Sequence, residues 1–235
     1  LNQFDPNRLL VNDGSCNFED VAPALGLDDE HRSLFATWVD LDQNGWLDLY
    51  LGNWGEAVPV DADVATPEPD RLWLADGQGG FVELSDQLPA ALHGNYAMTT
   101  GFLDFDGDGD LDLFQTNDKG AYGARNQLFR NDGVSLDGVE LMDVAVAAGF
   151  DLQIDGMGLA FLDIDLDGDP DVVNTGDYET VMVNHGDFFV DSGAALGLSG
   201  PGLGPLSWAV VAFDPDSDGR EDIFFVRSEF FDFGP

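Results

Sequence analysis

Four nine-residue acidic segments constrain this chain more than any other feature of its sequence. In one of them, Asp104–Asp112, carboxylates stand at positions 1, 3, 5 and 9, and glycine stands at position 6. The early odd positions turn their side-chain oxygens inward, and Gly109 permits the positive-φ bend that a Cβ would resist. The carbonyl of Asp110, at position 7, can complete a shell of oxygens. Ca²⁺ accepts six to eight such ligands in flexible geometry.

The same frame occurs four times, which argues against four unrelated, solvated acidic turns. We name the segments loop 1 (40–48), loop 2 (104–112), loop 3 (163–171) and loop 4 (214–222). We predict about four Ca²⁺ ions, one per loop, held by the side chains at positions 1, 3, 5 and 9 and the carbonyl at position 7. The predicted metal-site residues are Asp40, Asp42, Asn44, Trp46, Asp48, Asp104, Asp106, Asp108, Asp110, Asp112, Asp163, Asp165, Asp167, Asp169, Asp171, Asp214, Asp216, Asp218, Arg220 and Asp222.

The residues that follow each loop exclude an EF-hand, which needs Glu at position 12 on a helix leaving the loop. Position 12 is occupied here by Leu51, Gln115, Asn174 and Phe225. Short apolar runs typical of strands follow the loops, as at 47–51, and precede them, as at 35–39. Each loop is therefore predicted to join two antiparallel strands.

A second repeated pattern alternates with the loops. It is a strand-like run ending in Asn or Asp and Gly, followed by another short run, at 7–21, 70–84, 126–143 and, more loosely, 181–191. Asn-Gly or Asp-Gly between two strand-like runs indicates a hairpin. Each repeat would thus supply four strands, and the loops begin 64, 59 and 51 residues apart. Four short strands per unit at about this period are typical of a β-propeller.

We therefore predict an all-β fold, a β-propeller of four-stranded antiparallel blades in a single domain, 1–235. Segments 35–84, 98–143 and 158–191 are whole blades. Segments 208–226 plus 8–21 are two halves, and we expect the N-terminal hairpin to complete the last blade of a four-bladed ring. The alternative is a segment of a larger, seven-bladed propeller or of a longer protein.

These repeats resemble known families. The loops with their flanking strands look like the calcium-binding FG-GAP/VCBS repeats of integrin α-subunit propellers. The hairpin half, such as Asn-Arg-Leu-Leu-Val-Asn-Asp-Gly at 7–14 with Phe-Glu-Asp-Val at 18–21, is similar to bacterial relatives of cartilage acidic protein. The resemblance implies the same calcium ligands that the frame predicts, and it implies an adhesion-type role.

The composition limits the classes of binding partner and the cellular location that we expect for this chain. The formal charge of −38 argues against nucleic acid and anionic membrane surfaces as direct partners. The hydrophobic runs are too short for membrane insertion. An extracellular, cell-surface or periplasmic location would suit calcium loops. The missing initiator Met and signal-like segment predict a mature form or an excised part. Cys16, the single cysteine, is predicted to be a buried thiol.

Motifs of catalysis are absent from the sequence: there is no Gly-x-Ser-x-Gly, His-Glu-x-x-His, Cys-x-x-Cys or phosphate-binding glycine loop. The sequence therefore favours a non-enzymatic, calcium-binding module that binds a protein or a glycan. Two alternatives stay open. One is a carbohydrate-active or lyase-type enzyme on a propeller scaffold, because a fold does not decide function. The other is a structural subunit of a larger surface assembly.

The expected ligand face lies opposite the calcium loops. In a four-stranded meander, the connections after the second strand fall on that face, and each brings an aromatic residue. One connection also carries two basic residues. The ligand-face candidates are Trp54, Tyr122, Tyr178, Phe230, Lys119 and Arg125. The alternative is that the rings merely cap the edges of the blades. The sequence does not indicate an oligomeric state.

Overall fold

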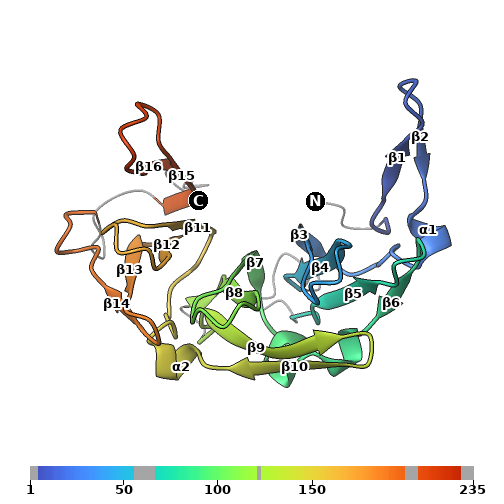
Figure 1. Ribbon diagram of the computed structural model, residues 1–235, viewed down its shortest axis with the longest axis horizontal. Coiled ribbons are helices and arrows are strands. Elements are labelled where there is room, and N and C mark those ends of the chain that lie inside the picture. Colours follow the sequence, from blue (N-terminus) through green and yellow to red (C-terminus); the bar gives the residue numbers. More distant parts are fainter. Residues whose placement is uncertain (1–4, 56–66, 121–122, 199–205, 229–235) are drawn as a thin grey trace, which may run out of the picture. The chain divides into compact units, whose positions relative to one another are not determined.

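The computed structural model describes residues 5–55, 67–120, 123–198 and 206–228. These residues form short antiparallel sheets linked by loops and single helical turns (Figure 1). Contacts divide the chain into two compact units. Unit 1 comprises Leu1–Ala97 with Asp132–Leu141, and unit 2 comprises Met98–Asn131 with Met142–Pro235. Each unit is described by itself.

Three four-stranded sheets confirm the predicted all-β fold of four-stranded antiparallel units. The first has the order β3 (Ser33–Val39), β4 (Asp48–Asn53), β5 (Arg71–Ala75) and β6 (Phe81–Glu83). The second consists of β7 (Ala97–Leu103), β8 (Asp112–Asn117), β9 (Gln127–Ser135) and β10 (Gly138–Asp143). The third consists of β11 (Gly158–Leu162), β12 (Asp171–Thr175), β13 (Thr180–Asn184) and β14 (Phe189–Asp191). Chain neighbours pair in each sheet, as a propeller blade requires.

Two hairpins occupy the positions of the predicted half-blades. They are β1 (Leu10–Asn12) with β2 (Phe18–Asp20) and β15 (Leu206–Phe213) with β16 (Asp222–Ser228). Each forms a two-stranded sheet of its own in the described structure. The fourth blade built from 208–226 plus 8–21, the closed ring and the single domain 1–235 therefore stay predictions.

Strand burial follows from the position of each strand in its sheet. The strands that leave loops 1 to 3 are β4, β8 and β12. All of their residues are buried, because both faces of these strands are covered. Unit 2 contains a core of Phe105, Phe114, Leu128, Phe150 and Phe189, among others, joining the second and third sheets. Ring pairs in this core meet nearly edge to face, an arrangement that stabilises aromatic clusters.

Two single-turn helices were not predicted from the sequence. They are α1 (Ala22–Leu25) and α2 (Ala145–Ala148), each directly after the last strand of a hairpin. Gly26 and Gly149 end them in the left-handed conformation, with φ of 69° and 74°. Two 3₁₀ turns, η1 (Ser85–Gln87) and η2 (Ala90–His93), follow β6. Among the described residues, no helix is long and apolar enough to cross a membrane.

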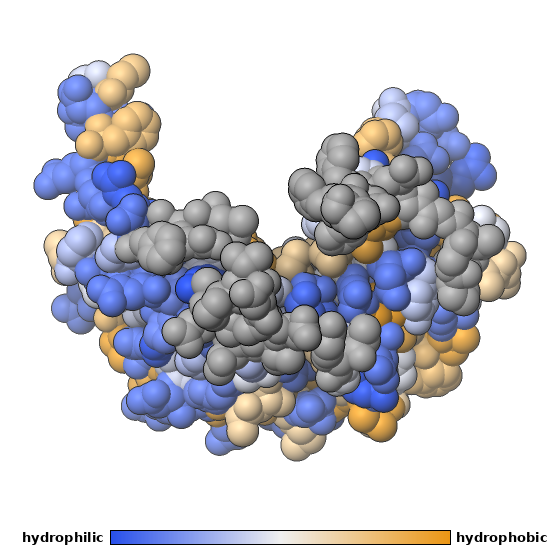
Figure 2. Space-filling model, turned by 180° about the vertical axis from the view of Figure 1, so that it is seen from behind, coloured by the Kyte–Doolittle hydropathy of each residue, from blue (hydrophilic) through white to orange (hydrophobic). Residues whose placement is uncertain are grey.

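The prediction of a buried Cys16 thiol is wrong, because Cys16 is exposed. It lies in the turn of the β1–β2 hairpin with φ of 65°, where tight turn geometry places the side chain at the tip. The same hairpin exposes Leu10, Val11 and Phe18. Orange patches mark apolar residues on this hairpin at the upper left of Figure 2, next to blue, hydrophilic residues.

Candidate metal centre

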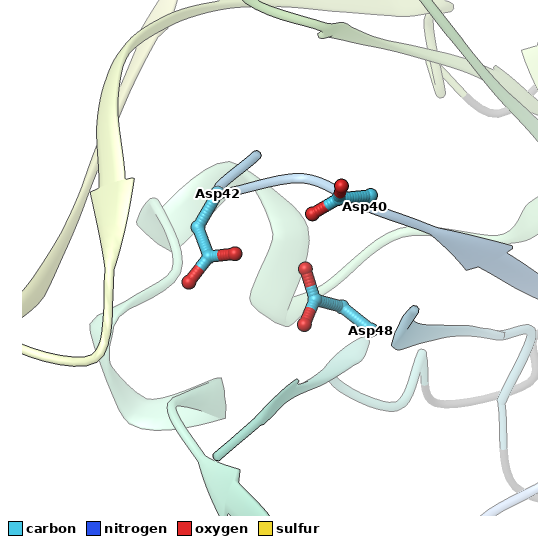
Figure 3. Close-up of side chains that lie close together, drawn as sticks. All are labelled: Asp40, Asp42 and Asp48. Carbon is cyan, nitrogen blue, oxygen red and sulfur yellow. The ribbon is translucent and has the colours of Figure 1, made fainter. Parts of the chain in front are cut away.

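Carboxylates converge in all four predicted loops. In each loop three aspartates place one oxygen each within 4.8 Å of the others. Figure 3 shows the carboxylates of Asp40, Asp42 and Asp48 pointing toward one another in loop 1. The other groups are Asp104, Asp106 and Asp108; Asp163, Asp165 and Asp171; and Asp214, Asp216 and Asp218. The structure thus brings positions 1 and 3 together in every loop, with position 5 or position 9 as the third member.

Backbone amides hold the position-1 and position-5 side chains in the same way in every loop. The position-6 amide donates to the position-1 carboxylate: Gly45 to Asp40 (3.0 Å), Gly109 to Asp104 (3.1 Å), Gly168 to Asp163 (3.0 Å) and Gly219 to Asp214 (2.9 Å). The position-7 amide donates to the position-5 side chain: Trp46 to Asn44 (2.8 Å), Asp110 to Asp108, Asp169 to Asp167 and Arg220 to Asp218 (each 2.9 Å). The predicted ligand role of the position-7 carbonyls stays a prediction.

Each loop also requires a positive φ at position 4, which the sequence pattern did not reveal. Like the glycine at position 6, the residue at position 4 has positive φ: Gln43 (54°), Gly107 (75°), Leu166 (61°) and Ser217 (60°). Three of these residues are not glycine, and a Cβ disfavours this conformation. Two left-handed residues in nine curl each loop around the converging carboxylates.

The aspartate at position 9 ties each of the first three loops to its sheet. Asp112 is fully buried, and its two oxygens accept hydrogen bonds from the amides of Phe105 (3.0 Å) and Asn131 (2.8 Å). Asp48 accepts from Leu41 and Ala75 in the same way, and Asp171 accepts from Ile164 and Asn184. This carboxylate therefore links the start of the loop to the third strand of its sheet.

Burial raises the pKa of these position-9 carboxyls, and so disfavours their charged form in the absence of a cation. Desolvation raises the pKa of Asp112 from 3.8 to about 7, against the opposing effect of its two amide donors. Desolvation also raises the pKa of Asp48 and of Asp171, with smaller contributions from neighbouring loop carboxylates. A nearby cation would favour the charged forms, because opposite charge lowers a carboxyl pKa.

Loop 4 differs from the other three loops. Position 2 is Pro215, which has no amide hydrogen to donate, and the position-9 residue Asp222 is exposed. The Arg220 guanidinium lies 2.7 Å from Asp218 Oδ2, and this side-chain hydrogen bond lowers the pKa of Asp218. A cation in this loop would therefore compete with Arg220 for one of its ligands.

The donor set fits Ca²⁺, and one atom in loop 1 points to a missing partner. Asp40 Oδ1 is buried without a hydrogen-bond partner, although it lies within the cluster of Asp40, Asp42 and Asp48. A buried carboxylate oxygen without a partner destabilises the folded state, whereas coordination to a hard cation such as Ca²⁺ would satisfy it. The other carboxylate oxygens that accept from backbone amides are held in positions where they could coordinate an ion.

Comparison with known proteins agrees with this geometry. Residues 104–174 match the FG-GAP-like repeat family. This span begins at position 1 of loop 2 and includes all of loop 3. The similarity to this family therefore covers loops 2 and 3. The remaining loops share the nine-residue frame of the matched FG-GAP-like segment.

The chain is also similar to cartilage acidic protein 1. It is 28% identical over 170 residues to the Mus musculus and Homo sapiens proteins, with 72% of this chain and 24% of each relative covered. The Xenopus tropicalis protein is 27% identical over 136 residues, which cover 55% of this chain and 18% of that protein. The chain spans about a quarter or less of the length of these relatives.

The ligand-face candidates are placed in part. The Trp54 ring packs edge-on against Tyr96 at 5.7 Å, and Tyr178 is half-buried. The two basic candidates lie beside acids: Lys119 Nζ is 3.6 Å from Asp118, and Arg125 Nη1 is 2.8 Å from Asp151. These ion pairs reduce the basic character that the sequence suggested. Tyr122 and Phe230 lie outside the described residues.

Proposed function

We propose that the chain is a calcium-stabilised repeat domain that acts as an extracellular interaction module. The observation that carries this proposal is the fourfold recurrence of one loop geometry, in which three carboxylate oxygens per loop converge within 4.8 Å. Ca²⁺ would be held by the side chains at positions 1, 3, 5 and 9. Its charge would offset the mutual repulsion of these carboxylates and fix the ends of two strands.

The role of the ion in this proposal is structural. Asp48, Asp112 and Asp171 each join a loop to the third strand of its sheet through two amide hydrogen bonds. An ion that keeps these buried carboxylates charged strengthens both hydrogen bonds, since ionised acceptors form the stronger ones. Binding to the folded state alone raises stability by linkage.

The interaction role and the location are supported by the FG-GAP-like match and by the similarity to cartilage acidic protein 1. We propose a protein or glycan ligand on the face opposite the calcium loops, with no direct nucleic-acid contact, in a secreted or surface-exposed protein. The histidines have contacts that suit structural roles: His31 bonds Asp29 at 2.6 Å, and His93 bonds the Leu88 carbonyl at 2.9 Å. An enzymatic role therefore has less support than an interaction role.

Thermal melts of the metal-free and calcium-loaded chain test the proposal. We expect chelation to lower the melting temperature clearly, and we expect Ca²⁺ to restore it while Mg²⁺ hardly does. Mg²⁺ requires near-octahedral geometry and dehydrates reluctantly, so it suits these cages poorly. Calorimetric titration should count about four ions. An unchanged melt after verified metal removal would refute the structural role of calcium.

A further inference from the structure

Asn184, the last residue of β13, joins loop 2 to loop 3 within unit 2. Its side-chain Nδ2 donates to the carbonyl of Phe105 in loop 2 and to that of Pro170 in loop 3, each at 3.2 Å. Its backbone amide donates to Asp171 Oδ1 at 2.7 Å. Asn184 is fully buried. One buried residue therefore touches both loops.

The contact in loop 2 falls on a residue that shapes the predicted site. Phe105 lies at position 2, between Asp104 and Asp106, and its amide donates to Asp112 Oδ2 at 3.0 Å. Its ring lies 6.0 Å from the Phe189 ring, which belongs to β14. The third sheet thus holds both the carbonyl and the ring of Phe105, and loop 2 holds its amide.

These contacts form a continuous path from one position-9 aspartate to the other: Asp171, Asn184, Phe105 and Asp112. A buried, satisfied hydrogen-bond network of this kind makes its members rigid. An ion that orders Asp171 would also order Asn184, and with it the backbone of Phe105. The ordering that loop 2 must undergo to bind its own ion would then already be partly complete.

We propose that Asn184 is a positioning residue that couples the calcium sites of loops 2 and 3, so that they bind Ca²⁺ with positive cooperativity. This inference rests on the proposed calcium binding. The coupling must be reciprocal, because each ion changes the affinity of the other site by the same factor.

The test follows calcium titration by amide NMR of the whole chain. The Gly109 and Gly168 amides, which donate to Asp104 and Asp163, report loops 2 and 3 separately. Loop 3 is disabled by Asp163→Asn with Asp165→Asn. We expect the calcium concentration for half-saturation at Gly109 to rise about fivefold, near the lower end of typical couplings. Disabling loop 2 by Asp104→Asn with Asp106→Asn should raise the calcium concentration for half-saturation at Gly168 by the same factor.

Asn184→Ala should abolish both shifts, because it removes the Nδ2 bridge while keeping the backbone amide on Asp171. Asn184→Ser, whose side chain is too short for the bridge, is the second variant if the alanine protein does not fold. The matched control is Asn174→Ala in β12, an equally buried asparagine that donates to Thr180 Oγ1 at 3.1 Å. The control should keep both shifts.

The outcomes separate the coupling from calcium binding itself. If the Gly109 amide signal has the same calcium dependence in the parent protein and in the variant with loop 3 disabled, the sites are independent and the coupling is refuted. If the shift survives in the Asn184 variants, the coupling does not pass through Asn184. If neither glycine of the parent protein responds to Ca²⁺, the proposed function fails, and the coupling with it.

Discussion

The buried carboxyl of Asp112 should make the stability of the calcium-free protein depend on pH. Its pKa in the folded state is about 7, raised by burial above the ordinary value of 3.8. The folded protein therefore holds this proton more tightly than the unfolded chain does. The contribution of Asp112 to stability is therefore full below about pH 4 and is lost as the pH rises through about 7.

The size of the effect follows from the shift. A difference of about 3 pKa units corresponds to about 4 kcal/mol in total, since each unit is worth 1.36 kcal/mol. Most of this falls below pH 6, and about 1 kcal/mol falls between pH 6 and pH 8. For a chain of this size, 1 kcal/mol shifts the melting temperature by roughly 2–4 °C.

The assay measures melting temperature from pH 6 to pH 8 on protein stripped of metal and on protein saturated with Ca²⁺. We expect the metal-free protein to lose those few degrees as the pH rises, and the calcium-loaded protein to stay level, because the cation keeps Asp112 ionised throughout. Asp112→Asn should reduce the slope whatever its own stability, and the raised pKa values of Asp48 and Asp171 account for the remainder. The matched control is Asp222→Asn, at the same loop position but exposed, which should retain the full slope.

Two results would refute this reasoning. One is a metal-free melting temperature that stays constant or rises between pH 6 and pH 8. The other is an equal loss of slope in Asp112→Asn and Asp222→Asn. All other ionisable groups are the same in both variants, so the difference between the variants isolates Asp112.

Three further predictions concern the sites, the ligand face and the ends of the chain. Asn44→Asp should tighten calcium binding in loop 1, which has three carboxylates where the others have four, and direct titration measures this. Joint replacement of Trp54 and Tyr122 by Ala should abolish binding to any ligand found by a glycan or protein screen, with the calcium-dependent melt intact. Deletion of 1–27 should cause aggregation, seen by light scattering, if 8–21 completes a blade with 208–226, because it exposes a strand edge; a monodisperse product argues against closure.

The local order of strands could be predicted from the sequence, because each signal is local. Short apolar runs predicted β3 and β4. The hairpin after 126–130 was predicted as well, but its turn was misplaced: Asn131, Asp132 and Gly133 lie within β9, and the chain turns at Leu136 and Asp137. The spacing of acids around one glycine likewise predicted that positions 1 and 3 would meet, but the structure adds only position 5 or position 9 to each group. The helical turns α1 and α2 were missed, since four residues are too few to show a helical period.

The sequence by itself determined the chemistry of the four loops: which residues carry oxygen, and that the chain bends at the glycine of position 6. Only the tertiary structure decided how those equivalent loops differ. Asp112 and Asp222 occupy the same position, but one is buried beneath a strand that donates an amide from Asn131 and the other is exposed. The pKa of a carboxyl and its contacts depend on the strands that cover it. Those strands come from distant parts of the chain, so a nine-residue pattern carries no record of them.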